Sequence, residues 1–155
     1  MHDRESIALY GGCKWEWWPE VEAEMERLDD PNEDEVAIQF LDTLIVRTEQ
    51  AGISAQDLTA PEGRDLGRRR LPWVGALKSE GFKRRGPEGV RTYRLYFSEA
   101  PEGEMGLFAA KLSWKCTKWN RQKTTTHQTS EIRHAIGVIE RYCSENGCQC
   151  RVIER

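Results

Sequence analysis

Apolar residues recur at spacings of three and four in three stretches of the chain, which is typical of amphipathic helices. The first stretch follows Pro19, a residue suited to the first turn of a helix, and is rich in acidic side chains. The second follows Asp30, which can cap a helix, with Pro31 in its first position and Gly52 after its end. Its predicted apolar face consists of Ala37, Phe40, Leu41, Leu44 and Thr48. The two stretches predict consecutive antiparallel helices.

The third stretch has the clearest helical pattern in the chain. Its apolar face consists of Ile132, Ala135, Ile136, Ile139, Tyr142 and Cys143. Thr129 or Ser130 can cap this helix, and Asn146 with Gly147 stops it. Residues 124–128 are then expected to link the helix to the strand before it.

Short apolar and alternating runs predict the strands. Residues 6–10 are expected to form the first strand, and residues 81–85 are the weakest candidate. Residues 90–97 alternate strictly, so Arg91, Tyr93, Leu95 and Phe97 are expected to face the core, with Arg94 on the open face. The last long strand is predicted over residues 105–112, and residues 151–153 could add an edge strand.

The predicted order is one strand, two helices, three strands and a final helix, which predicts an α+β fold with helices packed on a twisted sheet. At 155 residues the chain is expected to be one domain. It would carry an acidic N-terminal extension over about residues 1–35 and a short Cys-rich tail over residues 143–155.

The formal net charge of −3 is divided unevenly along the chain. Residues 1–62 hold 16 acidic and 4 basic side chains, a net −12, whereas residues 63–155 hold 10 acidic and 19 basic ones, a net +9. A basic face is therefore possible, and it favours a polyanionic partner. The acidic part could instead be a solvated helical face, or could cover the basic part by mimicking the polyanion.

No run approaches the 18 apolar residues of a membrane span, and the N-terminus lacks the features of a signal peptide, so we expect a cytoplasmic protein. Five cysteines in a reducing compartment are expected to be free thiols. Cys143, Cys148 and Cys150 do not have a familiar zinc spacing, so we expect no metal. A site completed by His134 or Cys116 is the alternative.

Residues 105–123 begin as an apolar strand and end as a cationic arm with aromatic residues. The arm contains Lys111, Lys115, Lys118, Arg121 and Lys123, with Trp114 and Trp119 among them. Cations spaced by aromatics suit phosphates and unstacked bases. The alternative is a solvated edge strand whose lysines oppose aggregation. Trp15, Trp17 and Trp18 pose a similar choice between core packing and an exposed platform for bases or a partner.

Three segments in this order resemble the RelE/HigB-type toxins of bacterial toxin–antitoxin pairs, above all the HigB-like, phage-derived branch. They are TYRLYF at residues 92–97, LFAAKLSWKCTK at 107–118 and SEIRHAIGVIERY at 130–142. With the two early helices, the resemblance covers roughly residues 36–142. It implies a RelE-like fold, a small twisted and mainly antiparallel sheet with two N-terminal helices and one C-terminal helix.

Members of that family typically cleave mRNA, often on the ribosome, without a metal or other cofactor, and are bound by a cognate antitoxin protein. The 2′-hydroxyl attacks the adjacent phosphate, a reaction that needs a base, an acid and cations. The resemblance implies that Arg94 holds the phosphate, that Lys115 and Lys118 stabilise the transition state, and that His127 acts as acid or base. The expected RNA contacts are Arg91, Lys111, Trp114, Trp119, Arg121 and Lys123.

A second interpretation keeps the fold without the catalysis. No Tyr occupies the first turns of the predicted last helix, where several relatives hold their acid or base, and His127 is the nearest substitute. The chain could then be a module that binds nucleic acid or a protein, with Arg94 and the lysines serving affinity alone. A relative directed at gyrase would also lack the catalytic set.

Overall fold

A five-stranded mixed sheet forms the centre of the fold, with its strands in the order β1-β6-β5-β4-β2. The structure is a computed structural model that describes residues 3–83 and 86–154. The sheet consists of β1 (Lys14–Trp17), β2 (Leu58–Thr59), β4 (Gly75–Glu80), β5 (Arg91–Glu99) and β6 (Gly106–Cys116). β1 runs parallel to β6, and the other three pairings are antiparallel. A second sheet pairs β3 (Arg70–Pro72) with β7 (Val152–Glu154).

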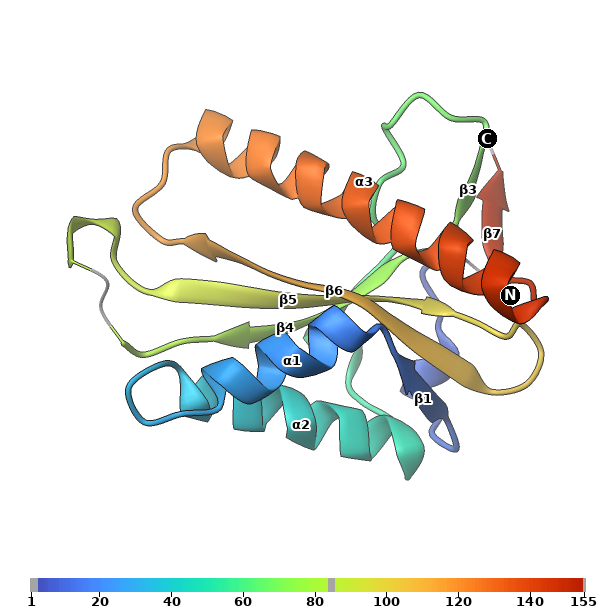
Figure 1. Ribbon diagram of the computed structural model, residues 1–155, viewed down its shortest axis with the longest axis horizontal. Coiled ribbons are helices and arrows are strands. Elements are labelled where there is room, and N and C mark those ends of the chain that lie inside the picture. The colour runs from blue at the N-terminus through green and yellow to red at the C-terminus, as the bar shows by residue number, and fades with distance from the viewer. Residues whose placement is uncertain (1–2, 84–85, 155) are drawn as a thin grey trace.

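Helices cover both faces of the main sheet (Figure 1). α1 (Pro19–Leu28) and α2 (Glu35–Glu49) lie on one face, and α3 (Arg121–Asn146) crosses the other. The α+β class and the mainly antiparallel sheet are therefore confirmed. α2 does not cover the side chains that β5 and β6 present to α3, because it occupies the opposite face, whereas Glu20 and Glu24 of α1 share a cavity with Lys111 at the edge of β6.

The hairpin of β5 and β6 sets which side chains face each layer. Tyr93, Leu95 and Phe97 are fully buried on the side of α1 and α2, as the alternation predicts. Tyr96, on the side of α3, is also buried, so both faces of this strand contribute to the core. A register shift at Tyr96 and Phe97 leaves Ala110 of β6 without a partner across the hairpin, which is a β-bulge.

Two strand predictions were wrong. Residues 6–10 contain the 3-10 helix η1 (Ile7–Leu9), because the Ser6 side chain accepts from the Ala8 amide and caps a helical turn. The first strand comes after the two glycines, and there Trp15 and Trp17 stack at 5.6 Å and are half-buried, which favours core packing for this cluster. The strand predicted at residues 81–85 is also wrong, because the strand of this region is β4, which ends at Glu80. Arg84 and Arg85 are outside the described residues.

The predicted helices exist, but two of them begin elsewhere. α2 begins after Asp34 rather than Asp30, and its buried face includes Ile38 and Ile45, whereas Phe40 is 43% exposed. α3 begins at Arg121, because the Asn120 side chain accepts from the Lys123 amide at 2.7 Å and caps the helix early. The expected linker at residues 124–128 is therefore helical. Its polar first turns carry no buried residue before Ile132.

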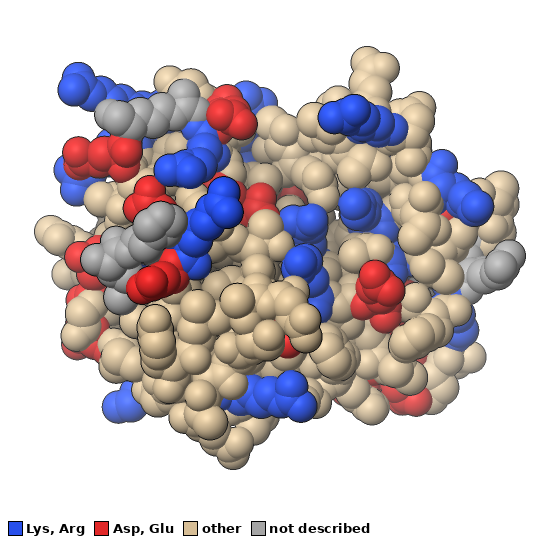
Figure 2. All heavy atoms as spheres, turned by 180° about the vertical axis from the view of Figure 1, so that it is seen from behind, with Lys and Arg blue, Asp and Glu red and all other residues tan. Residues whose placement is uncertain are grey.

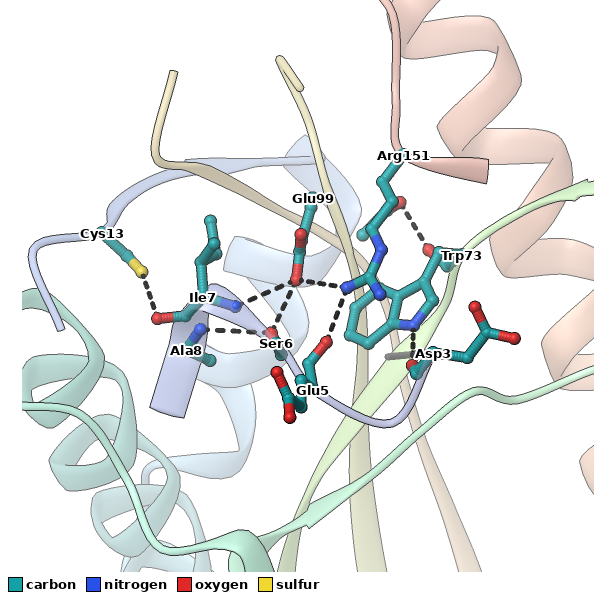
Figure 3. Close-up of polar contacts among 10 residues, drawn as sticks. Asp3, Glu5, Ser6, Ile7, Ala8, Cys13, Trp73, Glu99 and Arg151 are labelled. Atoms are coloured by element: carbon teal, nitrogen blue, oxygen red, sulfur yellow. Dashed lines mark hydrogen bonds and ion pairs between the residues drawn. The ribbon is translucent and has the colours of Figure 1, made fainter. Parts of the chain in front are cut away.

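A buried carboxylate joins both ends of the chain to the central strand β5 (Figure 3). Glu99 Oε2 accepts hydrogen bonds from Ser6 Oγ at 2.8 Å and from the Ile7 amide at 3.2 Å. Arg151 Nη1 lies 3.1 Å from the same oxygen, and the two side chains are only 13% and 7% exposed. The Arg151 guanidinium also stacks over Trp73 at 4.7 Å. A buried charge is stable only when it is paired and hydrogen-bonded, as Glu99 is here.

Replacing the carboxylate by an amide, Glu99→Gln, should lower the free energy of unfolding by about 3 kcal/mol, because it breaks the buried ion pair with Arg151. Urea denaturation measures this. The matched control is Glu140→Gln, which breaks an exposed pair with Arg68 whose side chains are 46% and 47% exposed, and should cost less than about 1 kcal/mol. Equal losses in the two variants would contradict the role given to Glu99.

Two buried tyrosines should make the protein sensitive to alkali. Burial raises the pKa of Tyr93 to about 12, helped by its hydrogen bond to Asp34, and burial raises the pKa of Tyr96 to about 12. The folded state then retains protons that the unfolded state releases near pH 10, so stability falls as pH rises from about 10 to about 12. Tyr96→Phe should weaken this dependence, whereas replacing the exposed Tyr10 should not. A urea midpoint that stays constant over this interval would contradict the assignment.

Candidate nucleic-acid interface

The register of the sheet places three cationic side chains on the face that carries α3. Arg94 of β5 pairs with Ser113 of β6 on one side and with Lys78 of β4 on the other. In the next row, Thr92 pairs with Lys115. Residues directly opposite on antiparallel strands point to the same face, so Lys78, Arg94 and Lys115 share the face that α3 covers.

Arg94 lies in a narrow crevice between this face and α3. The crevice is lined by Thr92, Arg94, Tyr96, Ser113, Trp114, Lys115 and Gln128. Arg94 Nη1 donates to Glu62 Oε1 at 3.0 Å, and the two side chains are 20% and 14% exposed. Burial raises the pKa of Glu62 even though Arg94 opposes the shift. Arg94 Nε is buried and has no hydrogen-bond partner among the described residues, so this donor is unsatisfied.

A larger groove of about 350 Å³ opens next to the crevice, where β1 ends and leaves the outer edge of β6 unpaired. Its floor is formed by residues 110–114 of β6, and its walls come from α1 and α3. The chemically active side chains in it are Lys111, Trp114, His127, Glu131 and His134, with Glu20 and Glu24 on the wall of α1. A hydrogen bond from Arg27 holds the pKa of Glu24 below its usual value, so that wall stays anionic.

Glu131 lies between the Lys111 ammonium and the His127 imidazole. Its Oε2 lies 3.5 Å from Lys111 Nζ, and its Oε1 lies 3.7 Å from His127 Nε2. Oε2 makes no hydrogen bond to a described residue, so the contact with Lys111 is an ion pair alone. A polyanion entering the groove would therefore meet a carboxylate beside its cations.

The Ser113, His127 and Glu131 side chains do not form a serine-hydrolase triad. Ser113 Oγ lies 3.4 Å from His127 Nε2, the same nitrogen that faces Glu131. A triad needs the carboxylate on the other ring nitrogen, so that the imidazole can take the proton of the serine. Ser113 is also buried, which leaves little access for a substrate to its hydroxyl.

The predicted stacking residues already bind cations of the protein. Arg91 stacks over Trp114 at 4.4 Å, and Lys123 stacks over Trp119 at 4.5 Å. The edge of Trp119 also meets the His127 ring at 5.0 Å. An RNA base can stack on either indole only by displacing Arg91 or Lys123, or by using the other face of the ring.

The structure thus divides the predicted residues into three groups. Arg94 and Lys115 line the crevice, and Lys111, Trp114 and His127 line the groove. Lys118 and Arg121 are exposed at the junction of β6 and α3, beside Lys123 and Trp119. Among the described residues, Lys115, Lys118 and Arg121 have no ion pair. Sequence reasoning missed Glu62, Ser113 and Glu131. The hairpin register places Ser113 and the early start of α3 places Glu131, whereas Glu62 comes from the segment between β2 and β3, where its amide donates to the Val74 carbonyl.

Basic side chains do not form an unbroken patch on the face opposite to that of Figure 1. Figure 2 shows Lys and Arg gathered near a hollow in the middle of this face, with acidic side chains among them and toward one end. A mixed surface of this kind gives weaker long-range attraction for a polyanion than a single-sign face would.

No group of three or more His, Cys, Asp or Glu in the described part of the chain is arranged to hold a metal ion. All five cysteines are free. Burial and the neighbouring thiols of Cys148 and Cys150 raise the pKa of Cys143, which indicates that the three thiols of the tail lie together.

No helix in the described residues is long and apolar enough to cross a membrane. Comparisons with protein-family models, with curated proteins and with solved structures found no match.

Removing the carboxylate from the groove should strengthen binding of single-stranded RNA. Glu131→Gln removes the counter-charge of Lys111, so affinity should rise by about three- to tenfold at low salt, with a steeper salt dependence, if RNA enters the groove. Fluorescence anisotropy with a labelled RNA measures this. Glu145→Gln is the matched control on the same helix, because Glu145 is 53% exposed, pairs with Arg141 and lies outside the groove. An unchanged affinity in Glu131→Gln would show that RNA does not enter the groove.

Proposed function

We propose that this chain is the toxin of a toxin–antitoxin pair and a metal-independent mRNA endoribonuclease of the RelE/HigB type. One observation supports this above the others: the crevice with Arg94 and Lys115 meets the groove with Lys111, His127 and His134 at Ser113. Cations and imidazoles in one concave region are the groups that cleavage of RNA by its own 2′-hydroxyl requires.

In this proposal the imidazole of His127 takes the proton of the 2′-hydroxyl, whose oxygen then attacks the adjacent phosphorus. The bond from phosphorus to the 5′-oxygen breaks and leaves a cyclic phosphate. His134 lies two helical turns further along α3, about 10 Å along its axis, and is the candidate that protonates the leaving oxygen. Arg94, Lys115 and Lys118 stabilise the charge that develops on the phosphate.

The order of the elements supports the RelE-like fold within this proposal. A strand and two helices precede the antiparallel strands β4, β5 and β6, and α3 follows. This is the order on which the resemblance to the family rests. The partners would be mRNA, in the free state or on the ribosome, and an antitoxin that covers the junction of β6 and α3.

A specific observation also favours the second function, a binding module without catalysis. Arg94 is paired with Glu62, and Lys111 and His127 are paired with Glu131. Cations held by carboxylates are positioned, but they offer less charge to a transition state. In that case Arg94 and the lysines contribute to affinity for nucleic acid or for a protein partner.

The test is induced expression in a bacterium with mapping of 5′ ends in total RNA. The wild-type protein should arrest growth and create new mRNA ends. Arg94→Ala, Lys115→Ala, Lys118→Ala and His127→Ala should be compared with it, and at least one should slow cleavage by a factor of about 100 or more. Arg133→Ala is the control, because Arg133 is exposed on α3 and lies outside both cavities.

Healthy growth with unchanged RNA ends, despite verified folded protein, would reject the nuclease. Retained RNA binding under those conditions, with modest and salt-sensitive losses in the same variants, would identify the binding module instead.

A further inference from the structure

The outer edge of β4 is only partly covered by β2. β2 pairs with Ala76 and Leu77, whereas β4 continues to Glu80. The chain leaves the edge at the 3-10 helix η2 (Ala55–Asp57), where the Asp57 amide donates to the Ser54 carbonyl at 3.0 Å. If the ladder of β2 and β4 continued, the Asp57 amide would donate to the Lys78 carbonyl. Because it donates to Ser54 instead, it is not available to Lys78.

The ladder geometry shows which backbone groups of this edge are open. The Gly81 amide donates to the Arg91 carbonyl at 2.8 Å, so Gly81 and Ser79 direct their backbone groups toward β5. By alternation, the Lys78 carbonyl and the amide and carbonyl of Glu80 face away from β5. No strand of residues 3–83 and 86–154 pairs with that side of β4 beyond Leu77.

Large apolar side chains lie exposed beside this edge. A cavity of about 530 Å³ there is lined by Val36, Phe40, Gln56, Asp57, Lys78, Ser79, Glu80, Phe82 and Thr92. Val36 is 59% exposed, Phe40 is 43% exposed and Phe82 is 75% exposed. An apolar cluster of this kind next to open backbone groups is typical of a site where another polypeptide binds.

We propose that this edge binds an extended segment of a partner protein, which adds a strand beyond Glu80 and places one large apolar side chain in the cavity. The inference does not depend on the proposed nuclease function, because the cavity is lined by none of the residues to which that function gives a role, although Thr92 borders both the cavity and the crevice. Backbone hydrogen bonds supply the affinity in this mode of recognition, and the pocket for alternate side chains supplies the specificity.

The register indicates the sequence of the segment. The Ser79 hydroxyl donates to the Ala37 carbonyl of α2 at 2.7 Å, so a residue opposite Ser79 points to the same side, over Val36 and Phe40. The residue opposite Glu80 points to the other side, where a basic side chain would pair with the carboxylate. A segment that runs in the direction of β2 therefore contains a basic residue followed by a large apolar one.

Neither the chain itself nor a second copy fits this edge. The chain itself does not continue the ladder, because residues 55–57 form η2 and the Asp57 amide already donates to the Ser54 carbonyl. Two β4 edges paired about Glu80 would set two carboxylates opposite each other. If the two copies paired with Ser79 opposite Ser79, residues 81 and 82 of the second copy would lie opposite Leu77 and Ala76. Those positions are already occupied by β2. A separate segment meets none of these conflicts.

The test uses a labelled nine-residue peptide of threonines with Arg-Leu at its centre. Titration by anisotropy should show saturable binding with a Kd on the order of 100 µM, as expected for a small interface. Amide shifts in a parallel nuclear magnetic resonance titration should be centred on residues 78–82. Replacement of the Leu by Ser, or N-methylation of the central amides, should weaken binding at least fivefold.

Variants of the protein test the same site from the other side. Val36→Ser and Phe82→Ser should each weaken binding at least fivefold, with unchanged circular dichroism. Val46→Ser is the matched control, since Val46 is 46% exposed on the same helix but does not line the cavity. Absence of saturable binding up to about ten times the expected Kd, or equal loss in Val46→Ser, would overturn the proposal. So would a dimer in sedimentation that Phe82→Ser dissociates, because the occupant would then be a second copy.

Discussion

The pairing of one buried carboxylate, that of Glu99, determines how the two ends of the chain meet the sheet. A charge in this position costs several kcal/mol unless it is compensated, so the surrounding structure must supply a cation and donors. It does so from residues far apart in sequence, Ser6 and Ile7 on one side and Arg151 on the other (Figure 3). Both terminal segments are fixed at the end of β5. This contact therefore sets where β1 begins after the N-terminal segment and where α3 ends before the C-terminal one.

On the N-terminal side, the anchored segment leads through a glycine turn into β1, which pairs with the first part of β6 only. Beyond Ala109 the bulge at Ala110 changes the register, and after Trp18 the chain leaves the edge of β6 to form α1 on the face of the sheet. The groove exists because β1 stops there while β6 continues for seven more residues to Cys116. The position of the groove thus depends on the shortness of β1, which has only four residues.

Local patterns in the sequence predicted the helices and the central hairpin, because those elements bury one regular face. Tyr93, Leu95 and Phe97 could be assigned to the core from alternation alone. The start of α3 could not, because its first turns bury nothing and depend on the cap at Asn120. Phe40 was misassigned for a related reason: α2 has apolar side chains on two faces, and the pattern does not show which one meets the sheet.

The candidate site was predictable in its residue types but not in its pairings. Arg94 was placed by the strand pattern and Lys115 by the cationic arm expected after residue 112, where β6 in fact continues to Cys116. Their relation to Ser113 and His127 depends on a hairpin register and a helix start. The carboxylates of Glu62 and Glu131 were the largest omission, and they change the physical picture most. The side chain of a cation that is already held by a carboxylate loses little conformational entropy when it binds a phosphate. It must, however, give up the carboxylate to bind the phosphate.

That exchange connects the two interpretations of the site. Burial raises the pKa of Glu62 in spite of the neighbouring arginine, so protonation of this carboxyl is easier than that of an exposed one. A phosphate that contacts Arg94 would make the Glu62 site still more negative and so favour a proton there. Arg94 would then be released to the phosphate without leaving its place between β4 and β6. The ion pair of Arg94 with Glu62 therefore weakens the attraction of the empty site for a polyanion. It is still compatible with phosphate binding, because protonation of Glu62 would leave the positive charge of Arg94 to the phosphate.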